Sequence, residues 1–180
     1  MIEYRRPSLD EAGIFAALHV QCWREAYKDI VPAELLAQVT PEKRIDMWRD
    51  VPVNPTRIVI GAYDEGIAVG LAVAGAPHDN IRENEDGQLA ALYVLEKFHR
   101  LGIGRALVQQ CAAQWLAMGG HSISLSVLAK NRTARTFYES MGARFLKSSV
   151  YGWDGVPIPT AIYIWDDLPA LIGKDRQSLP

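Results

Sequence analysis

The sequence predicts a single-domain α/β fold, with a mixed central sheet of about six or seven strands flanked by about four helices. Short apolar runs rich in β-branched residues alternate with longer segments in which apolar residues recur every three or four positions. The length of 180 residues suits one domain. An apolar share of 49% and a charged share of 22% are typical of a globular protein, so a single core can be buried.

Caps and apolar periodicity mark the expected helices. Ser8 and Glu11 form a capping box ahead of the first helix, on which Ile14, Leu18 and Cys22 form an apolar face. A threonine followed by proline restarts a second helical region, and glycines end the last two helices. The expected helical segments are 8–27, a region beginning near 40, 103–118 and 133–141.

Apolar runs bounded by turn residues mark the expected strands. Asp64-Glu65-Gly66 has the composition of a tight hairpin turn between two of them. The expected strands are 2–6, 57–62, 67–76, 89–95, 123–128, 144–151 and 160–165, with a loop at 77–87. We expect the domain to span residues 1–166 and a C-terminal tail to span 167–180, disordered from residue 173.

Charge, cysteine usage and the N-terminus exclude several classes of protein. A net charge of −2 gives no general electrostatic reason to bind nucleic acid. Cys22 and Cys111 match no metal or redox spacing, and no histidine partner is evident that would make either a nucleophile. The N-terminus lacks the apolar core of a signal peptide, and the longest apolar run, 67–76, is about half the length of a membrane span. We therefore expect a cytoplasmic protein without metal, nucleic acid or membrane partners.

The most informative segment is the strand–turn–helix connection around Gly102 and Gly104. The glycines permit close backbone approach, and the first amide groups of the helix point outward at the positive end of its dipole. Arg100 and Arg105 add charge, so the turn suits a phosphate or pyrophosphate, although the glycines could simply shape a tight connection. Leu107 replaces the third small residue of a dinucleotide fold, and no lysine follows the second glycine as in a P-loop.

Two motifs together resemble those of the GNAT superfamily of N-acetyltransferases. The first is Gln/Arg-x-x-Gly-x-Gly/Ala after a strand like Leu92-Tyr93-Val94, and it corresponds to His99-Arg100-Leu101-Gly102-Ile103-Gly104. The second is an asparagine followed seven residues later by tyrosine and then by a helix-ending glycine, here Asn131, Tyr138 and Gly142. The resemblance extends from residue 2 to about residue 165 and implies an acyl-CoA-dependent acetyltransferase.

The resemblance implies a role for each matching residue. The strand edge would pair with the pantetheine arm of acetyl-CoA, the turn would hold the pyrophosphate, and Asn131 would lie beside the arm. The residues expected to bind acetyl-CoA are Leu92, Tyr93, Val94, His99, Arg100, Leu101, Gly102, Ile103, Gly104, Arg105 and Asn131. Tyr138 would protonate the departing thiolate, since a phenol of pKa about 10 can donate to a thiolate of pKa about 8.5. Composition alone favours core aromatics at Phe137 and Tyr138, but the position of Tyr138 seven residues after Asn131 reverses this preference. Asn131 could equally be a helix cap, and the two roles are compatible.

Aromatic residues mark the expected acceptor site. Trp23 and Tyr27 lie four residues apart on one helix face, where the resemblance places the acceptor, with core packing as an equal alternative. Trp153 lies in a turn-rich stretch and is expected to be exposed. The expected partner is a small-molecule or peptide amine of open identity, and the sequence is compatible with a homodimer.

Three positions depart from the family pattern. His99 replaces Gln or Arg and is interpreted as a surface residue or a pH-sensitive contact, and Arg100 replaces a common glycine. Gln88 replaces a glutamate that serves as general base in many relatives. The remaining candidate bases are Glu25, Glu83, Glu85 and Asp86. The base is therefore unassigned, and an acceptor amine of low pKa would need none.

The leading hypothesis is direct attack of a primary amine on acetyl-CoA in a ternary complex, with Tyr138 as general acid and no covalent enzyme intermediate. The alternative is a non-catalytic acyl-CoA-binding sensor or interaction module. Gln88 favours this alternative, whereas the retained Tyr138 argues against it, because a binding protein needs no proton donor. A structural domain without a ligand would leave the joint match of the two motifs to coincidence.

Overall fold

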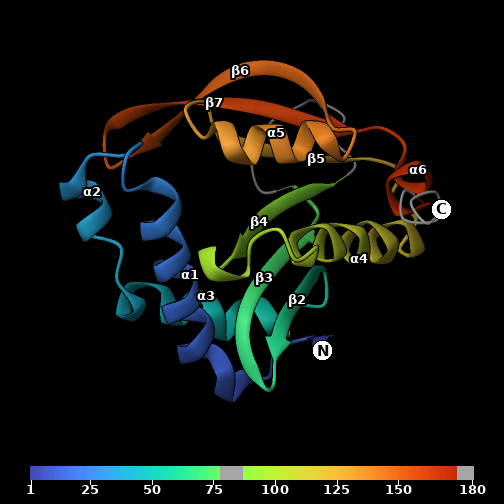
Figure 1. Ribbon diagram of the computed structural model, residues 1–180, viewed down its shortest axis with the longest axis horizontal. Coiled ribbons are helices and arrows are strands. Elements are labelled where there is room, and N and C mark those ends of the chain that lie inside the picture. The colour runs from blue at the N-terminus through green and yellow to red at the C-terminus, as the bar shows by residue number, and fades with distance from the viewer. Residues whose placement is uncertain (78–86, 174–180) are drawn as a thin grey trace. The chain divides into compact units, whose positions relative to one another are not determined.

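The computed structural model describes residues 1–77 and 87–173 (Figure 1). Its strands form a mixed seven-stranded sheet in the order β1-β2-β3-β4-β5-β7-β6, which confirms the predicted fold class. The strands are β1 (Ile2–Arg5), β2 (Arg57–Asp64), β3 (Ile67–Gly75), β4 (Gln88–Val94), β5 (Ile123–Leu128), β6 (Arg144–Trp153) and β7 (Val156–Trp165). Within the described residues the helices are α1 (Ala12–Tyr27), α2 (Ala33–Ala37), α3 (Pro41–Asp50), α4 (Ile103–Ala117), α5 (Arg132–Ser140) and α6 (Leu168–Gly173), with 3₁₀ turns η1 (Leu9–Glu11), η2 (Val51–Val53) and η3 (Glu96–Phe98).

The chain divides into two compact units. The first comprises Met1–Val73 and Ala91–Val108, and the second comprises Ala74–Ala90 and Gln109–Pro180. No helix within the described ranges is long and apolar enough to span a membrane.

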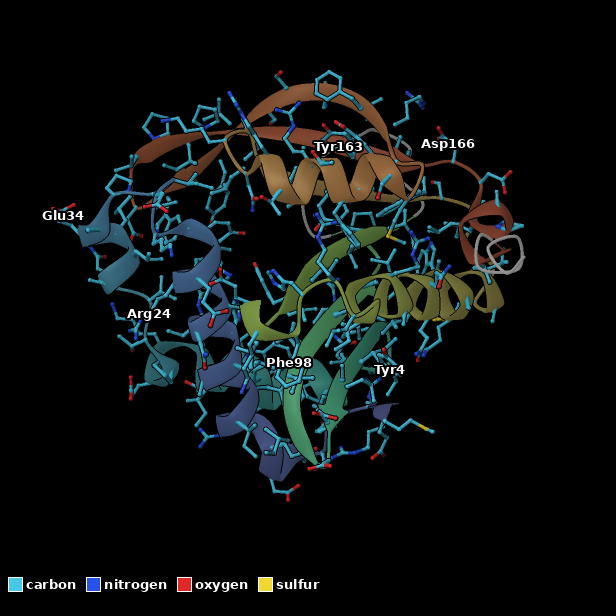
Figure 2. All side chains as sticks on the ribbon, viewed as in Figure 1. Tyr4, Arg24, Glu34, Phe98, Tyr163 and Asp166 are labelled. Carbon is cyan, nitrogen blue, oxygen red and sulfur yellow. The ribbon has the colours of Figure 1, made fainter. Side chains whose placement is uncertain are left out.

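The first unit has an aromatic core between α1, α3 and the strands. Phe15, Trp48 and Tyr63 are at most 1% exposed, and the ring centre of Phe15 lies 5.3 Å from that of Trp48 and 5.9 Å from that of Tyr63. Phe98, labelled in Figure 2, packs against this cluster from η3. Burial of several large aromatic rings supplies much of the hydrophobic stabilisation of this unit.

Two local predictions in the first unit have different outcomes. The Ser8–Glu11 capping box is present, although it opens the short turn η1 rather than α1 itself. The predicted apolar face is wrong at Ile14, which is 53% exposed, while Phe15 is fully buried. The buried face of α1 is centred on Phe15, Leu18 and Cys22, and a neighbouring residue lies about 100° around the helix. Because Ile14 and Phe15 are both apolar, the helical spacing alone did not show which of them is buried.

The second unit contains α5 and the β6–β7 hairpin, drawn in orange and red in Figure 1. Arg135 Nε of α5 donates to Tyr163 Oη of β7 at 3.0 Å, and Tyr163 Oη donates to Glu139 Oε1 at 2.5 Å. These bonds hold α5 against the sheet, and Tyr163 is labelled there in Figure 2.

The hairpin and the C-terminal helix extend the second unit beyond the expected elements. The predicted exposure of Trp153 is wrong, because β6 continues to this residue, which pairs with Val156 and is 7% exposed. Within the expected tail, α6 buries Leu168 and Leu171, and Gln109 Nε2 donates to the Leu171 carbonyl at 3.2 Å. Most of the predicted loop at 77–87 and the end of the expected tail lie outside the described residues.

Replacing Phe15 with alanine is expected to destabilise the protein by about 3–5 kcal/mol, since it empties a fully buried aromatic site. Ile14→Ala, one residue earlier on the exposed face, is the matched control and should change the free energy of unfolding by no more than about 0.5 kcal/mol. Urea denaturation of both variants measures the difference. Equal losses would contradict the assignment of the buried face.

Glu11 is expected to make the free energy of unfolding fall at acidic pH. Two hydrogen bonds from the Arg5 guanidinium, at 2.7 and 2.8 Å, lower the pKa of Glu11 from 4.5 to about 2. Because the folded-state pKa lies below the ordinary value, this contribution is present above pH 4.5 and is lost as the pH falls toward 2. Urea denaturation at pH 7 and pH 3 should show a smaller loss for Glu11→Gln than for the parent protein. Glu34→Gln, at an exposed position of α2, should behave like the parent.

Candidate active site

The turn between β4 and α4 forms the first part of the candidate site, and it lies within the first unit. Two of its residues have left-handed backbone conformations, Arg100 with φ 65° and Gly102 with φ 80°. Glycine adopts this conformation freely, whereas a residue with a Cβ atom is strained by about 1–2 kcal/mol. This explains why the family pattern commonly has glycine where this chain has Arg100.

The turn presents the N-terminus of α4. The Ala106 amide donates to the Gly102 carbonyl at 3.0 Å, which is the first bond of the helix. The amide groups of Ile103 and Gly104 therefore lie in the first turn, where no acceptor exists within the helix. Arg100 is exposed and Arg105 is half-buried, so two cationic side chains accompany these amides. Such an arrangement can bind an anion by backbone donors, helix dipole and charge together.

His99 closes the turn onto the preceding strand. Its side chain is exposed, yet Nε2 lies 2.8 Å from the carbonyl oxygen of Val94. Since a carbonyl can only accept, Nε2 is the donor in this bond. His99 is thus both a surface residue and a contact within the turn.

An aromatic cluster forms the second part of the site in the first unit. It consists of His19, Trp23, Tyr27, Trp48 and Tyr93. The ring centres of Trp23 and Tyr27 are 5.5 Å apart, and Tyr93 hydrogen-bonds to the Tyr27 hydroxyl. Burial raises the pKa of Tyr27, and this hydrogen bond offsets the effect in part. Trp23 and Tyr27, the predicted acceptor residues, therefore both contact Tyr93 of the strand predicted to bind acetyl-CoA.

His19 and Arg44 belong to this region and were not predicted. His19 is 5% exposed and stacks on Tyr93, with ring centres 5.0 Å apart and planes at 23°. The Arg44 guanidinium lies 4.9 Å from the ring centre of Trp23. Burial, with a smaller contribution from the charge of Arg44, lowers the pKa of His19 to about 3. The four-residue spacing of His19, Trp23 and Tyr27 was a signal that could have identified the histidine.

The candidate general bases are only partly described. Glu25 Oε1 accepts from Gln21 at 2.9 Å, and Oε2 accepts from the Glu96 amide at 2.8 Å, so this carboxylate ties α1 to η3. Gln88 is 4% exposed and lies opposite Ser124 in the second unit. The other candidates, Glu83, Glu85 and Asp86, lie outside the described residues.

Asn131 and Tyr138 occupy α5 of the second unit. The Asn131 side chain caps the helix by accepting from the Ala134 amide at 3.1 Å. Tyr138 is 8% exposed, and its ring centre lies 5.9 Å from that of Trp165 in an edge-to-face arrangement. Both residues therefore have structural roles, as cap and as packed aromatic, whatever else they do.

Neither cysteine is suited to nucleophilic catalysis. Cys22 and Cys111 are buried free thiols, and burial raises the pKa of each to about 12. Both are therefore protonated at neutral pH, and the thiol is a poor nucleophile. Within the described residues, no group of three or more His, Cys, Asp or Glu side chains could hold a metal ion.

Comparisons with known proteins agree with this picture. The sequence model of the acetyltransferase (GNAT) family matches residues 17–143. YuaI of Bacillus subtilis strain 168, named an uncharacterized N-acetyltransferase, is 28% identical over 171 residues, covering 95% of this chain and 96% of that protein. Rv2669 of Mycobacterium tuberculosis strain H37Rv, similarly named, is 26% identical over 114 residues, covering 63% of this chain and 69% of that protein.

Solved structures share the fold. PaiA N-acetyltransferase of Thermoplasma acidophilum, in complex with coenzyme A, has a TM-score of 0.68 at 19% identity, covering 89% of this chain and 98% of that one. YncA of Salmonella typhimurium, with acetyl-CoA, has a TM-score of 0.68 at 12% identity, covering 92% of this chain and 94% of that one. Because the family model covers most of the chain, the chain belongs to the GNAT acetyltransferase family and is an acyltransferase.

Proposed function

We propose that the protein transfers the acetyl group of acetyl-CoA to a primary amine, by direct attack of the amine on the thioester. The observation that carries the proposal is the β4–α4 turn, whose left-handed residues Arg100 and Gly102 present the N-terminus of α4 as an anion site. Coenzyme A or acetyl-CoA is bound by the fold relatives PaiA and YncA, which supports the same donor here.

The proposed acetyl-CoA site uses mainly backbone groups. The pyrophosphate would accept from amides between Arg100 and Arg105, and the two arginines would add charge. The backbone of Leu92–Val94 would hydrogen-bond to the amide groups of the pantetheine arm. Backbone recognition tolerates changes of side chain, so His99 and Arg100 are compatible with binding despite their departure from the family pattern.

The proposed reaction needs no enzyme-bound acyl intermediate. The amine nitrogen attacks the thioester carbon, the carbon–sulfur bond breaks, and the nitrogen loses a proton to solvent. The buried, protonated thiols of Cys22 and Cys111 support direct transfer, because neither can accept the acetyl group first.

Tyr138 is the proposed general acid. Its hydroxyl would donate a proton to the CoA thiolate as the thiolate leaves. The ring is packed against Trp165 and Phe137, with centres 5.9 and 5.3 Å away, so its orientation is restricted. A fixed donor loses little entropy in the transition state.

Within the described residues, neither Gln88 nor Glu25 offers the acceptor amine a free base. Gln88 cannot accept a proton from an ammonium group, and both oxygens of Glu25 already accept hydrogen bonds. An amine of low pKa is largely neutral near pH 7 and reacts without a base, so such amines are the preferred acceptors in this proposal. The same Gln88 favours the second candidate function, an acyl-CoA-binding sensor without turnover.

Tyr138→Phe is expected to lower kcat by about 10²-fold or more while leaving the Kd for acetyl-CoA nearly unchanged, because only the proton donor is removed. Thiol release measures kcat with a panel of amines, and calorimetry measures the Kd. Tyr151→Phe, the same change at a 53% exposed position of β6, is the matched control and should alter neither quantity. An unchanged kcat in Tyr138→Phe would refute the assigned acid. Acetyl-CoA binding by the parent without thiol release from any amine would favour the sensor.

A further inference from the structure

His19 holds a buried hydrogen-bond donor to which no described residue offers an acceptor. Trp48 Nε1 donates to His19 Nδ1 at 3.3 Å, and an indole can only donate. Nδ1 is therefore unprotonated, and the proton of the neutral imidazole lies on Nε2. Within the described residues, Nε2 is buried and has no hydrogen-bond partner. A buried donor without an acceptor destabilises the folded protein, so a ligand that offers an acceptor is bound with a corresponding gain.

The neighbouring rings hold this donor in a fixed orientation. The imidazole stacks on Tyr93, meets Trp23 edge-on with centres 5.2 Å apart, and is nearly perpendicular to Trp48 at 6.1 Å. Burial keeps the pKa of His19 near 3, so the imidazole stays neutral at physiological pH. Nε2–H is therefore a constant donor and not a base.

Arg44 supplies a positive charge beside this donor. Its guanidinium lies over Trp23, whose ring also contacts His19, and its charge helps to lower the pKa of His19. Arg44 therefore reaches from α3 to the Trp23 ring on α1. A neutral N–H donor and a guanidinium next to the same indole are suited to a carboxylate attached to an apolar or aromatic body.

We propose that His19 and Arg44 recognise a carboxylate on the acceptor amine, with His19 Nε2–H as the hydrogen-bond donor and Arg44 as the opposite charge. This rests on the proposed function, since it takes the aromatic cluster as part of the acceptor site. The preferred acceptors are then amines that carry both a carboxylate and an aromatic or apolar group. Because Nε2 is buried, the side chains that cover it must move for the carboxylate to reach it.

The test compares two probes that differ in one carboxylate, 4-(aminomethyl)benzoate and benzylamine. Calorimetric titration of the protein, with and without coenzyme A, should show about tenfold tighter binding of the carboxylate. His19→Leu and Arg44→Gln should each reduce this preference to within about twofold. His19→Gln keeps an N–H donor and should retain part of the preference for the carboxylate probe. Arg49→Gln, the same change at an exposed position of α3 that pairs with Asp46, should leave it intact.

If His19 and Arg44 had only structural roles, their replacement would lower the temperature of unfolding or weaken acetyl-CoA binding. The proposal instead predicts that both quantities remain close to those of the parent in Arg44→Gln and His19→Gln. The inference is overturned if the parent shows no carboxylate preference, binds neither probe, or keeps its preference in both His19→Leu and Arg44→Gln. Failure to bind acetyl-CoA, measured in a separate titration, would instead count against the proposed function. The two failures can therefore be distinguished.

Nuclear magnetic resonance of the histidine side chains adds a direct readout. A long-range proton–nitrogen spectrum should show His19 as the neutral Nε2–H tautomer. Addition of 4-(aminomethyl)benzoate should shift the Nε2 resonance, and addition of benzylamine should shift it less. A resonance that moves with neither probe would contradict a contact between His19 and the carboxylate.

Discussion

The proposed active site depends on how the chain leaves β4 and starts α4. Only eight residues separate Val94 from Ile103, and within them η3 forms and the backbone twice adopts a left-handed conformation. Leu95 N–H donates to the Val69 carbonyl at 3.0 Å, and His99 donates to the Val94 carbonyl at 2.8 Å, so the turn is fixed to the sheet. A helix N-terminus held this firmly is preorganised for the proposed anion site, because little freedom would be lost when a pyrophosphate binds.

The aromatic cluster connects the packing of the first unit with the proposed acceptor site. Trp48 packs in the core against Phe15 and also sets the tautomer of His19 through its indole N–H. Tyr93 extends from the strand whose backbone is proposed to hold acetyl-CoA, and it stacks on the same imidazole. A single set of rings therefore positions the donor strand and a buried polar group together.

Local signals in the sequence predicted most of the fold, and contacts between distant segments account for what it missed. The hairpin turn at Glu65 and Gly66 was predictable, because both residues adopt the positive φ that its composition favours. The hydrogen bond from Trp48 to His19 was not predictable, since Trp48 lies 29 residues away on another helix. The exposure of Trp153 was predicted wrongly, because the glycines at 152 and 155 indicated a loop where β6 in fact continues to residue 153. The role of Tyr138 stays a proposal, because a packed tyrosine and a proton donor leave the same pattern in sequence.

Calorimetric titration with acetyl-CoA tests the central claim most directly, with ATP and NAD as competing nucleotides and two glycine variants as probes. Gly102 and Gly66 have φ values of 80° and 82°, and an added Cβ would meet no atom within 4 Å at either position. Alanine therefore introduces similar backbone strain at both, but only the first lies in the β4–α4 turn. The account predicts saturable binding of acetyl-CoA alone, weakened by Gly102→Ala and unaffected by Gly66→Ala. A folded protein that does not bind acetyl-CoA, or two variants that bind it equally well, would contradict the claim.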